Sequence, residues 1–174
     1  MGTKGVAGFR WRGRTITVYN CFDSYPSGLG VAVLLQLLWE MMRDPDLTRW
    51  KEQIDRLEKV EIPDLWQLQR NHNGLQLPRV LDMGMYCHEE PLTACDLFRH
   101  YGYWIDLDKN RLIFATMREN DTGGTEYDGG TYSYIPFDTL PKGEPKKTDL
   151  ERLFEQPNLK PMPRSDILEL YGVD

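Results

Sequence analysis

Alternating apolar positions predict that the chain opens with a β-hairpin. Residues 3–11 are rich in apolar and small residues, and an Arg-Gly-Arg turn signal follows at positions 12–14. In residues 15–19, Ile16 and Val18 alternate with threonine, as expected for a strand with one buried face. The two segments would pair as antiparallel strands across the turn.

Apolar residues at helical spacing predict a long and largely buried helix at residues 29–43. They recur every three or four positions and are Val31, Leu34, Leu35, Leu38 and Met42. Because Leu34, Leu35 and Leu38 fall toward one face, we expect these three side chains to be almost fully buried. An Asp-Pro-Asp sequence at 44–46 ends the helix.

Shorter helices are predicted in the middle of the chain. Asp46 can cap a helix whose inward positions are Leu47, Trp50, Ile54 and Leu57, and Pro63 can open a third, short helix. Residues 76–87 fit either a short strand or a loop. Residues 93–100 have the pattern of another helix.

The second half of the chain combines a further hairpin with a proline-rich end. Residues 103–108 and 111–115 predict strands around an Lys-Asn turn, and residues 132–137 predict one more strand. Four of the eleven prolines lie between positions 145 and 163. We expect short helices at 150–154 and 165–171 there, the second capped by Ser165.

These elements predict an α+β fold. Residues 1–141 would form a single domain, in which two hairpins build an antiparallel sheet and the helices pack on it. Residues 142–174 would form a proline-rich arm whose short helices pack on the same domain.

Composition and charge narrow the class of protein. A chain of 174 residues with 40% hydrophobic content can bury a proper core. A formal net charge of −6 argues against a nucleic-acid partner, since such proteins carry a basic face. The longest apolar run, 31–39, is too short to span a bilayer, so no membrane partner is predicted. Three cysteines without framework spacing favour a reducing, cytoplasmic location.

The stretch YNCFDSYPSGLG at 19–30 is the strongest candidate site. Its glycines permit close approach of a ligand to the backbone, and the helix that follows offers unpaired N–H groups. The candidate ligand- or partner-binding residues are Asp23, Ser24, Tyr25, Ser27, Gly28 and Gly30. The alternative is a simple bend from strand to helix, in which Ser27 is the helix cap.

Thr3 is a candidate catalytic residue. A threonine that begins a strand can act as a nucleophile when its own α-amine is free to serve as the base. Here that would require removal of both Met1 and Gly2. The alternative is that Thr3 is only the first residue of the strand.

No metal site and no cofactor is predicted. The run formed by Cys87, His88, Cys95 and His100 lacks the paired spacing of a zinc site, and buried cysteines explain it better. Residues 106–110 resemble the opening of a calcium loop, but Arg111 stands where that loop requires glycine. A hairpin turn is the better interpretation.

Two stretches resemble an uncharacterised protein family of bacteria, phages and fungi. They are Gly2-Thr3-Lys4-Gly5 followed by YNCFDSYPSGLG, and YGYWIDLD at 101–108. Members of the family open with Gly-Thr-Arg-Gly, carry an Asp-Gly/Ser-Tyr-Pro-x-Gly-x-Gly loop and later a Tyr-x-Ile/Val-Asp-Leu-Asp strand; Lys4 stands where their arginine is usual. The resemblance implies the extent of the domain and the importance of the loop. It supplies no chemistry, because the family has no established activity.

Two functions follow from these features. The first is a non-catalytic binding or regulatory module that acts through a protein partner or a small ligand at loop 23–30. The alternative is a small amide hydrolase, since Thr3 and the opening hairpin more faintly resemble N-terminal-nucleophile hydrolases. For the loop itself we expect a positive φ at Gly28 or Gly30, and a core position for Phe22 with Asp23 directed outward.

Overall fold

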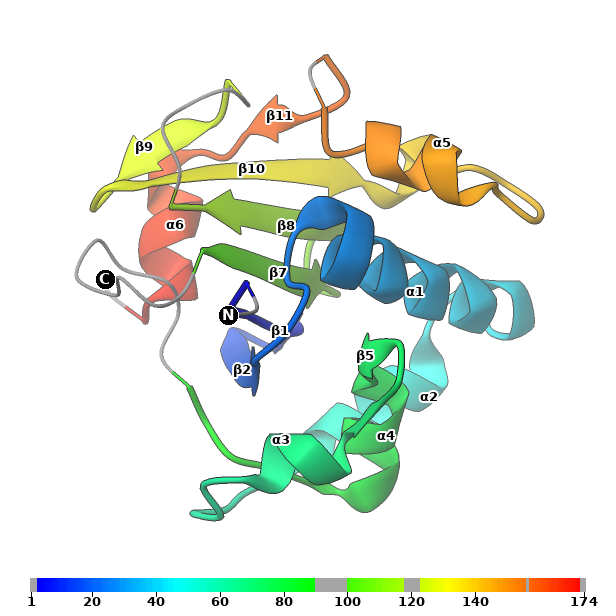
Figure 1. Ribbon diagram of the computed structural model, residues 1–174, viewed down its shortest axis with the longest axis vertical. Coiled ribbons are helices and arrows are strands. Elements are labelled where there is room, and N and C mark those ends of the chain that lie inside the picture. The colour runs from blue at the N-terminus through cyan, green and yellow to red at the C-terminus, as the bar shows by residue number, and fades with distance from the viewer. Residues whose placement is uncertain (1–2, 90–99, 118–122, 156, 173–174) are drawn as a thin grey trace.

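A seven-stranded sheet is the centre of the molecule (Figure 1). The computed structural model describes residues 3–89, 100–117, 123–155 and 157–172. Its strands follow the order β11-β10-β8-β7-β1-β2, and β9 pairs with β10. They are β1 (Gly5–Trp11), β2 (Arg14–Asn20), β7 (Tyr101–Asp106), β8 (Arg111–Thr116), β9 (Thr125–Tyr127), β10 (Gly130–Pro136) and β11 (Lys160–Pro161).

The fold is α+β, but its sheet is mixed. β1 pairs antiparallel with β2 and β7 pairs antiparallel with β8, whereas β1 and β7 run parallel, with Gly5 beside Tyr101. The prediction of a purely antiparallel sheet is therefore wrong. The β1–β2 hairpin returns the chain to the edge of the sheet where β1 begins, because Asn20 lies beside Gly5. The long connection to β7 carries several helices and ends at the same edge, so β7 runs in the same direction as β1.

The two faces of the sheet bury two separate hydrophobic clusters. Alternation along β7 directs Tyr103 and Ile105 to one face and Trp104 to the other. The larger cluster lies beneath α1 (Val31–Arg43) and also holds Trp50 of α2 (Thr48–Asp55). The smaller cluster lies beneath α6 (Arg164–Leu170), on the opposite face (Figure 1).

α1 buries a different face from the one that its sequence predicted. Leu34 is fully buried and Leu38 is 6% exposed, as expected, but Leu35 is only half-buried. Leu37, which is fully buried, completes the inner face instead. Positions 34, 37 and 38 follow the i, i+3, i+4 spacing, whereas position 35 is turned about 100° from position 34 on a helix of 3.6 residues per turn.

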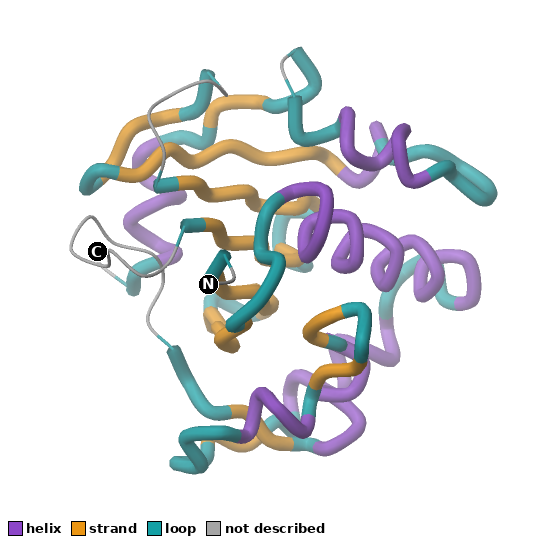
Figure 2. The backbone as a smooth tube through the Cα atoms, viewed as in Figure 1, coloured by secondary structure: helices purple, strands orange, loops and turns teal. Residues whose placement is uncertain are grey.

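The middle of the chain forms a group of short elements beside the main sheet (Figure 2). After α2 come β3 (Glu58–Lys59), α3 (Leu65–Leu68), β4 (Arg70–Asn71), β5 (Gly74–Leu75), α4 (Leu77–Met83) and β6 (Met85–Tyr86). α4 lies in the segment that was predicted as strand or loop. Its helical spacing buries Leu77, Val80 and Leu81. Residues 93–99 of the predicted helix 93–100 lie outside the described residues.

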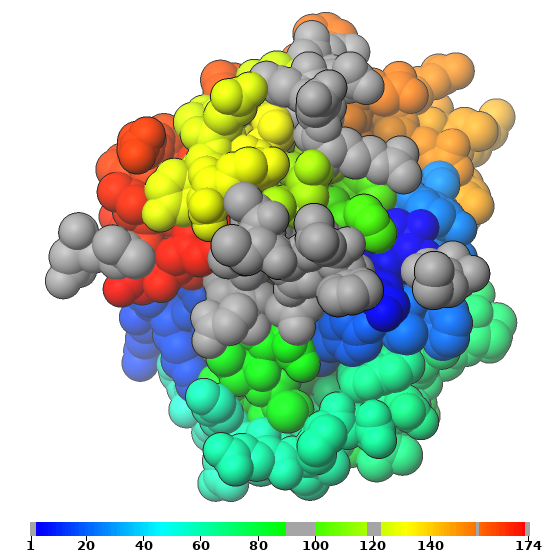
Figure 3. Space-filling view, turned by 60° about the vertical axis from the view of Figure 1, so that its left-hand side comes forward, coloured from blue at the N-terminus to red at the C-terminus, as the bar shows by residue number. Residues whose placement is uncertain are grey.

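The C-terminal segment returns to the sheet. η2 (Phe137–Thr139) and α5 (Lys147–Arg152) precede β11, which pairs with β10. In Figure 3 the red C-terminal residues lie against the yellow β9 segment, and the rings of Tyr127 and Tyr171 are 5.4 Å apart. Ser165 is not a cap: α6 begins at Arg164 after Pro163, without a side-chain capping bond. None of the described helices has the length and apolarity needed to cross a membrane.

An ion-pair network joins α6 to the β7–β8 turn. Asp166 accepts hydrogen bonds from Lys109 Nζ at 2.8 Å and pairs with Arg111 Nη1 at 2.9 Å. Arg111 Nε also donates to Asp106 at 2.9 Å, and that carboxylate is almost completely buried. These contacts attach α6 to the sheet by charge as well as by its apolar face.

The network predicts a specific loss of stability in acid. Burial alone would raise the pKa of Asp166, but hydrogen bonds from Lys109 and Arg111 and their positive charges lower it. A carboxyl with a lowered folded-state pKa stabilises the protein above its unfolded pKa, about 3.9, and loses that contribution as the pH falls through the folded value. Urea unfolding at pH 7, 5 and 3 should show Asp166→Asn less stable than the parent at pH 7. The difference should shrink at pH 3; a constant difference would contradict the assignment.

Candidate functional site

The loop between β2 and α1 is a tight turn built around Asp23. This residue has a left-handed backbone, with a φ of 50°. Its carbonyl oxygen accepts a hydrogen bond from Leu29 N at 2.8 Å, and Gly28 N donates to Tyr25 O at 2.9 Å. The loop therefore closes on itself and continues through η1 (Pro26–Gly30), a π-helical turn, into α1.

The loop requires glycine at positions 28 and 30 because a side chain there would collide with neighbouring atoms, and not because the backbone has a positive φ. Neither Gly28 nor Gly30 has a positive φ, so that prediction is wrong; Asp23 takes the left-handed position, which aspartate tolerates. A Cβ on Gly28 would lie 2.2 Å from the carbonyl oxygen of Asp23. A Cβ on Gly30, which is buried, would lie 2.9 Å from the Tyr103 ring.

We expect Gly28→Val to destabilise the protein by about 1–3 kcal/mol, because the Asp23 carbonyl must move to admit the side chain. Chemical denaturation of the variant measures this loss. Ser27→Ala is the matched control in the same turn, because Ser27 is exposed and should change stability by less than about 0.5 kcal/mol. A valine variant as stable as the parent would contradict the close approach.

The inner side of the loop is held by buried hydrogen bonds. Ser24 is fully buried; its Oγ accepts from Asn20 Nδ2 at 2.8 Å and its carbonyl oxygen accepts from Tyr103 Oη at 2.8 Å. Ser24 N donates to Thr3 O at 3.1 Å, which fixes the start of β1 to the loop. Ser24 therefore positions the loop, and its side chain does not reach the surface.

The outer side of the loop presents Asp23 and Tyr25 to solvent. Tyr25 Oη donates to Asp23 Oδ1 at 2.8 Å, and this bond together with the negative charge of Asp23 raises the pKa of Tyr25. Phe22 is 45% exposed, so its predicted core position is wrong. β2 ends at Asn20, two residues earlier, so strand alternation no longer directs Phe22 inward.

Ser27 does not cap a helix. Neither η1 nor α1 has a side-chain capping bond, because the π-helical turn continues directly into the α-helix and supplies α1 with a preceding helical residue, Gly30. The expected cap is therefore wrong, and Ser27 is exposed. Its place is on the rim of the neighbouring hollow.

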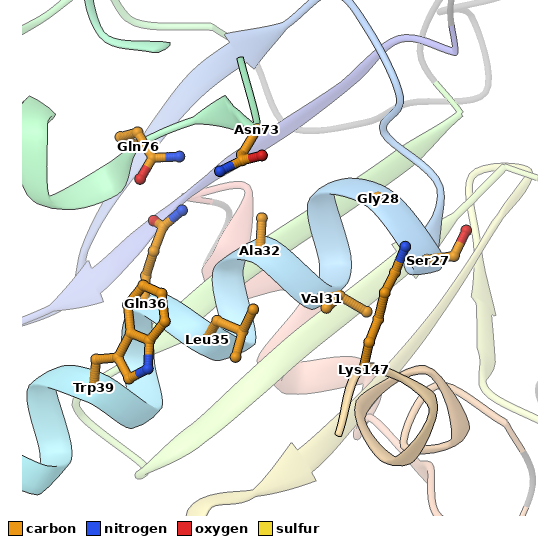
Figure 4. Close-up of a pocket in the computed structure, with 10 residues that line it drawn as sticks. All are labelled: Ser27, Gly28, Val31, Ala32, Leu35, Gln36, Trp39, Asn73, Gln76 and Lys147. Carbon is orange, nitrogen blue, oxygen red and sulfur yellow. The ribbon is translucent and has the colours of Figure 1, made fainter. Parts of the chain in front are cut away.

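A hollow of about 340 Å³ lies between the loop and the outer face of α1 (Figure 4). Lys147 extends toward it from α5, and Asn73 and Gln76 close its other side (Figure 4). Its lining consists of Ser27, Gly28, Val31, Ala32, Leu35, Gln36, Trp39, Asn73, Gln76 and Lys147. The Gln36 side chain is itself buried and bonded to the backbone of Leu75 and Leu77, so this wall is rigid.

The most exposed apolar residues of α1 were missed by the sequence analysis. Trp39 is 57% exposed and Met42 is 62% exposed. With Leu35 they follow the i, i+4, i+7 spacing, on a face turned away from that of Leu34, and Leu38 lies between the two. Because α1 is apolar on more than one side, its sequence predicts a largely buried helix and does not distinguish Trp39 as exposed.

A second, polar hollow of about 150 Å³ lies between the loop and the turn that joins β4 to β5. Its lining includes the ring of Phe22 and the polar groups of Asn20, Asp23, Arg70, His72 and Asn73. Arg70 and His72 were not among the predicted site residues. Both hollows share Gly28 and Asn73, so they lie on either side of the same wall.

The other candidate residues do not join these hollows. Thr3 is half-buried, and the contact recorded above is made by its carbonyl oxygen. Cys95 lies outside the described residues, and Cys87 is half-buried with a free thiol. Within the part of the chain that the structure describes, no group of three or more His, Cys, Asp or Glu side chains could hold a metal ion.

The calcium-like segment 106–110 has a structural role. Asp108 accepts hydrogen bonds from the backbone N–H groups of Arg12 and Gly13, at 2.8 and 2.9 Å. This carboxylate therefore joins the β7–β8 turn to the β1–β2 turn, while Asp106 pairs with Arg111. Both carboxylates therefore make contacts that stabilise the fold.

No protein-family model, no curated protein and no solved structure matches this chain. The resemblance carried by the Gly-Thr-Lys-Gly start and the YNCFDSYPSGLG loop stays a prediction. The function must be argued from the geometry of the site.

Proposed function

We propose that this protein is a non-catalytic binding module whose partner is another protein. The partner would cover the outer stripe of α1, defined by Leu35, Trp39 and Met42, beside loop 23–30. The exposure of Trp39 and Met42, 57% and 62%, is the observation that carries the proposal. Contiguous apolar side chains on a surface mark interaction sites, and tryptophan is the residue most enriched where binding energy concentrates.

The length of the outer stripe favours a protein over a small molecule. From Ala32 to Met42 the helix rises about 15 Å. A hollow lies at each end: the one of about 340 Å³ beside the loop, and another of about 290 Å³ lined by Met41, Met42, Phe137 and Leu140 among others. Side chains of an amphipathic helix, spaced three and four residues apart, can enter two such hollows at once.

The charges around the stripe indicate the chemistry of the partner. Lys147 lies in the first hollow, whereas the second is lined by both Lys142 and Asp138. A segment with an acidic residue at the end that meets Lys147 would complement this lysine, which favours a defined orientation more than it raises affinity. Ser27 and Gly28 contribute the wall of the first hollow, and this is how loop 23–30 would take part.

Selection of displayed amphipathic peptides against the intact protein tests the proposal. The selected peptides should have apolar residues at helical spacing and an acidic residue at one end. They should bind Trp39→Ala at least about tenfold more weakly, as expected for loss of a central aromatic anchor. They should bind Ile62→Ala as tightly as the parent, because Ile62 is 45% exposed but lines neither hollow. Peptides that bind both variants equally would contradict the proposal.

A second copy of the chain is the competing occupant of the outer stripe. Sedimentation at increasing protein concentration separates the two cases. A monomer at all concentrations agrees with a different partner. Self-association that Trp39→Ala abolishes would replace the proposed partner with the chain itself.

A further inference from the structure

Two residues that line the polar hollow beside Asp23 each have a buried polar atom without a partner among the described residues. Asn20 is 1% exposed, and its Nδ2 donates to Phe22 O and to Ser24 Oγ, which fixes the orientation of the amide. Its Oδ1 is then left buried and without a donor among the described residues. A buried acceptor without a donor is costly, so a ligand that reaches this wall of the hollow and donates to the oxygen would be favoured.

Arg70 provides a positively charged donor group at the same hollow. Its guanidinium lies 5.0 Å from the ring centre of Phe22 and 5.8 Å from that of Trp66, and these contacts orient it. Its Nε is buried and, in the described ranges, donates to no acceptor. A planar guanidinium held in this way matches the two oxygens of a carboxylate.

Asp23 provides a negative charge in the same hollow. Its Oδ1 accepts from Tyr25, and a carboxylate retains lone pairs on both oxygens for further donors. Arg70 and Asp23 therefore offer opposite charges to one small ligand, with Asn20 Oδ1 as an additional acceptor. A ligand with only one charge would leave the other group unmatched.

We propose that the polar hollow binds a free α-amino acid with a small side chain. Its carboxylate would pair with Arg70, and its ammonium group would donate to Asp23 and Asn20. The volume of about 150 Å³ suits such a ligand, because a cavity of this size holds about six non-hydrogen atoms, the size of benzene, and alanine has the same number. This site goes beyond the proposed partner surface and does not depend on it.

Calorimetric titration of the intact protein with alanine tests the charge pattern. Propanoate and ethylamine are the matched probes, since each keeps one charged group of alanine and lacks the other. Alanine should bind at least tenfold more tightly than either probe. Equal binding of propanoate, or no heat from glycine, alanine and serine at millimolar concentration, would overturn the proposal. Tighter binding of dialanine would overturn it in favour of a peptide end.

Two variants locate the binding. Asp23→Asn keeps the shape of the side chain and Arg70→Gln removes the guanidinium; each should weaken alanine binding at least tenfold. Asp46→Asn and Arg56→Gln are the matched controls, because both residues are exposed and lie outside the hollow. Melting by circular dichroism confirms that each variant is folded. Unchanged affinity in a folded Asp23→Asn protein would contradict the site even if Arg70→Gln fails to fold.

Discussion

Arg111→Met is expected to destabilise the protein by about 3–5 kcal/mol, the cost of removing one partner from a buried ion pair. Asp106 is 1% exposed, and without Arg111 the donors that remain to it among the described residues are the backbone N–H groups of Asp108 and Lys109. The same change removes one of the two cations that pair with Asp166 on α6. Equilibrium unfolding in guanidinium chloride measures the loss.

A second substitution separates the lost charge from lost packing. Asp106→Asn in the Arg111→Met background keeps an acceptor for the backbone and removes the unpaired charge, so it should recover part of the stability. Arg56→Met is the surface control, since the Arg56 side chain is 78% exposed, and should cost less than about 0.5 kcal/mol. If the free energy of unfolding of Arg111→Met lies within about 0.5 kcal/mol of the parent's, the ion pair contributes nothing to stability.

Leu34→Ala should cost about 2–5 kcal/mol, because it leaves a cavity in the larger cluster beneath α1. Met42→Ala is the matched test at an exposed position of the same helix: Met42 is 62% exposed, so its loss should leave stability almost unchanged. Thermal or chemical unfolding of both variants measures the contrast. If the two substitutions lower the free energy of unfolding by similar amounts, the outer stripe is part of the core.

Much of the sheet could be predicted from local pattern. The alternation of Ile16 and Val18 located β2, and the two apolar runs around Lys109-Asn110 located β7 and β8. The parallel pairing of β1 with β7 could not be predicted, because it depends on the edge of the sheet to which the long connection after β2 returns the chain. α4 was missed because a short apolar run is equally consistent with a strand and a helix.

The candidate site was found in part. The turn chemistry of YNCFDSYPSGLG identified the correct loop, but the sequence could not show that Ser24 faces inward and Tyr25 outward. Asn20 and Arg70 are fifty positions apart, and only the packing of the β4–β5 turn against the loop brings them to one hollow. Trp39 was missed because an apolar residue on an apolar helix carries no local sign of exposure.

Photo-crosslinking from position 39 tests the partner surface most directly. Benzoylphenylalanine would replace Trp39 in cells of the source organism, with Ile62 replaced in parallel as the exposed apolar control. The account predicts one discrete protein adduct from position 39 that is absent from position 62, and that is lost when Met42→Glu places a charge in the stripe. No adduct from position 39, or the same adduct from both positions, would contradict it.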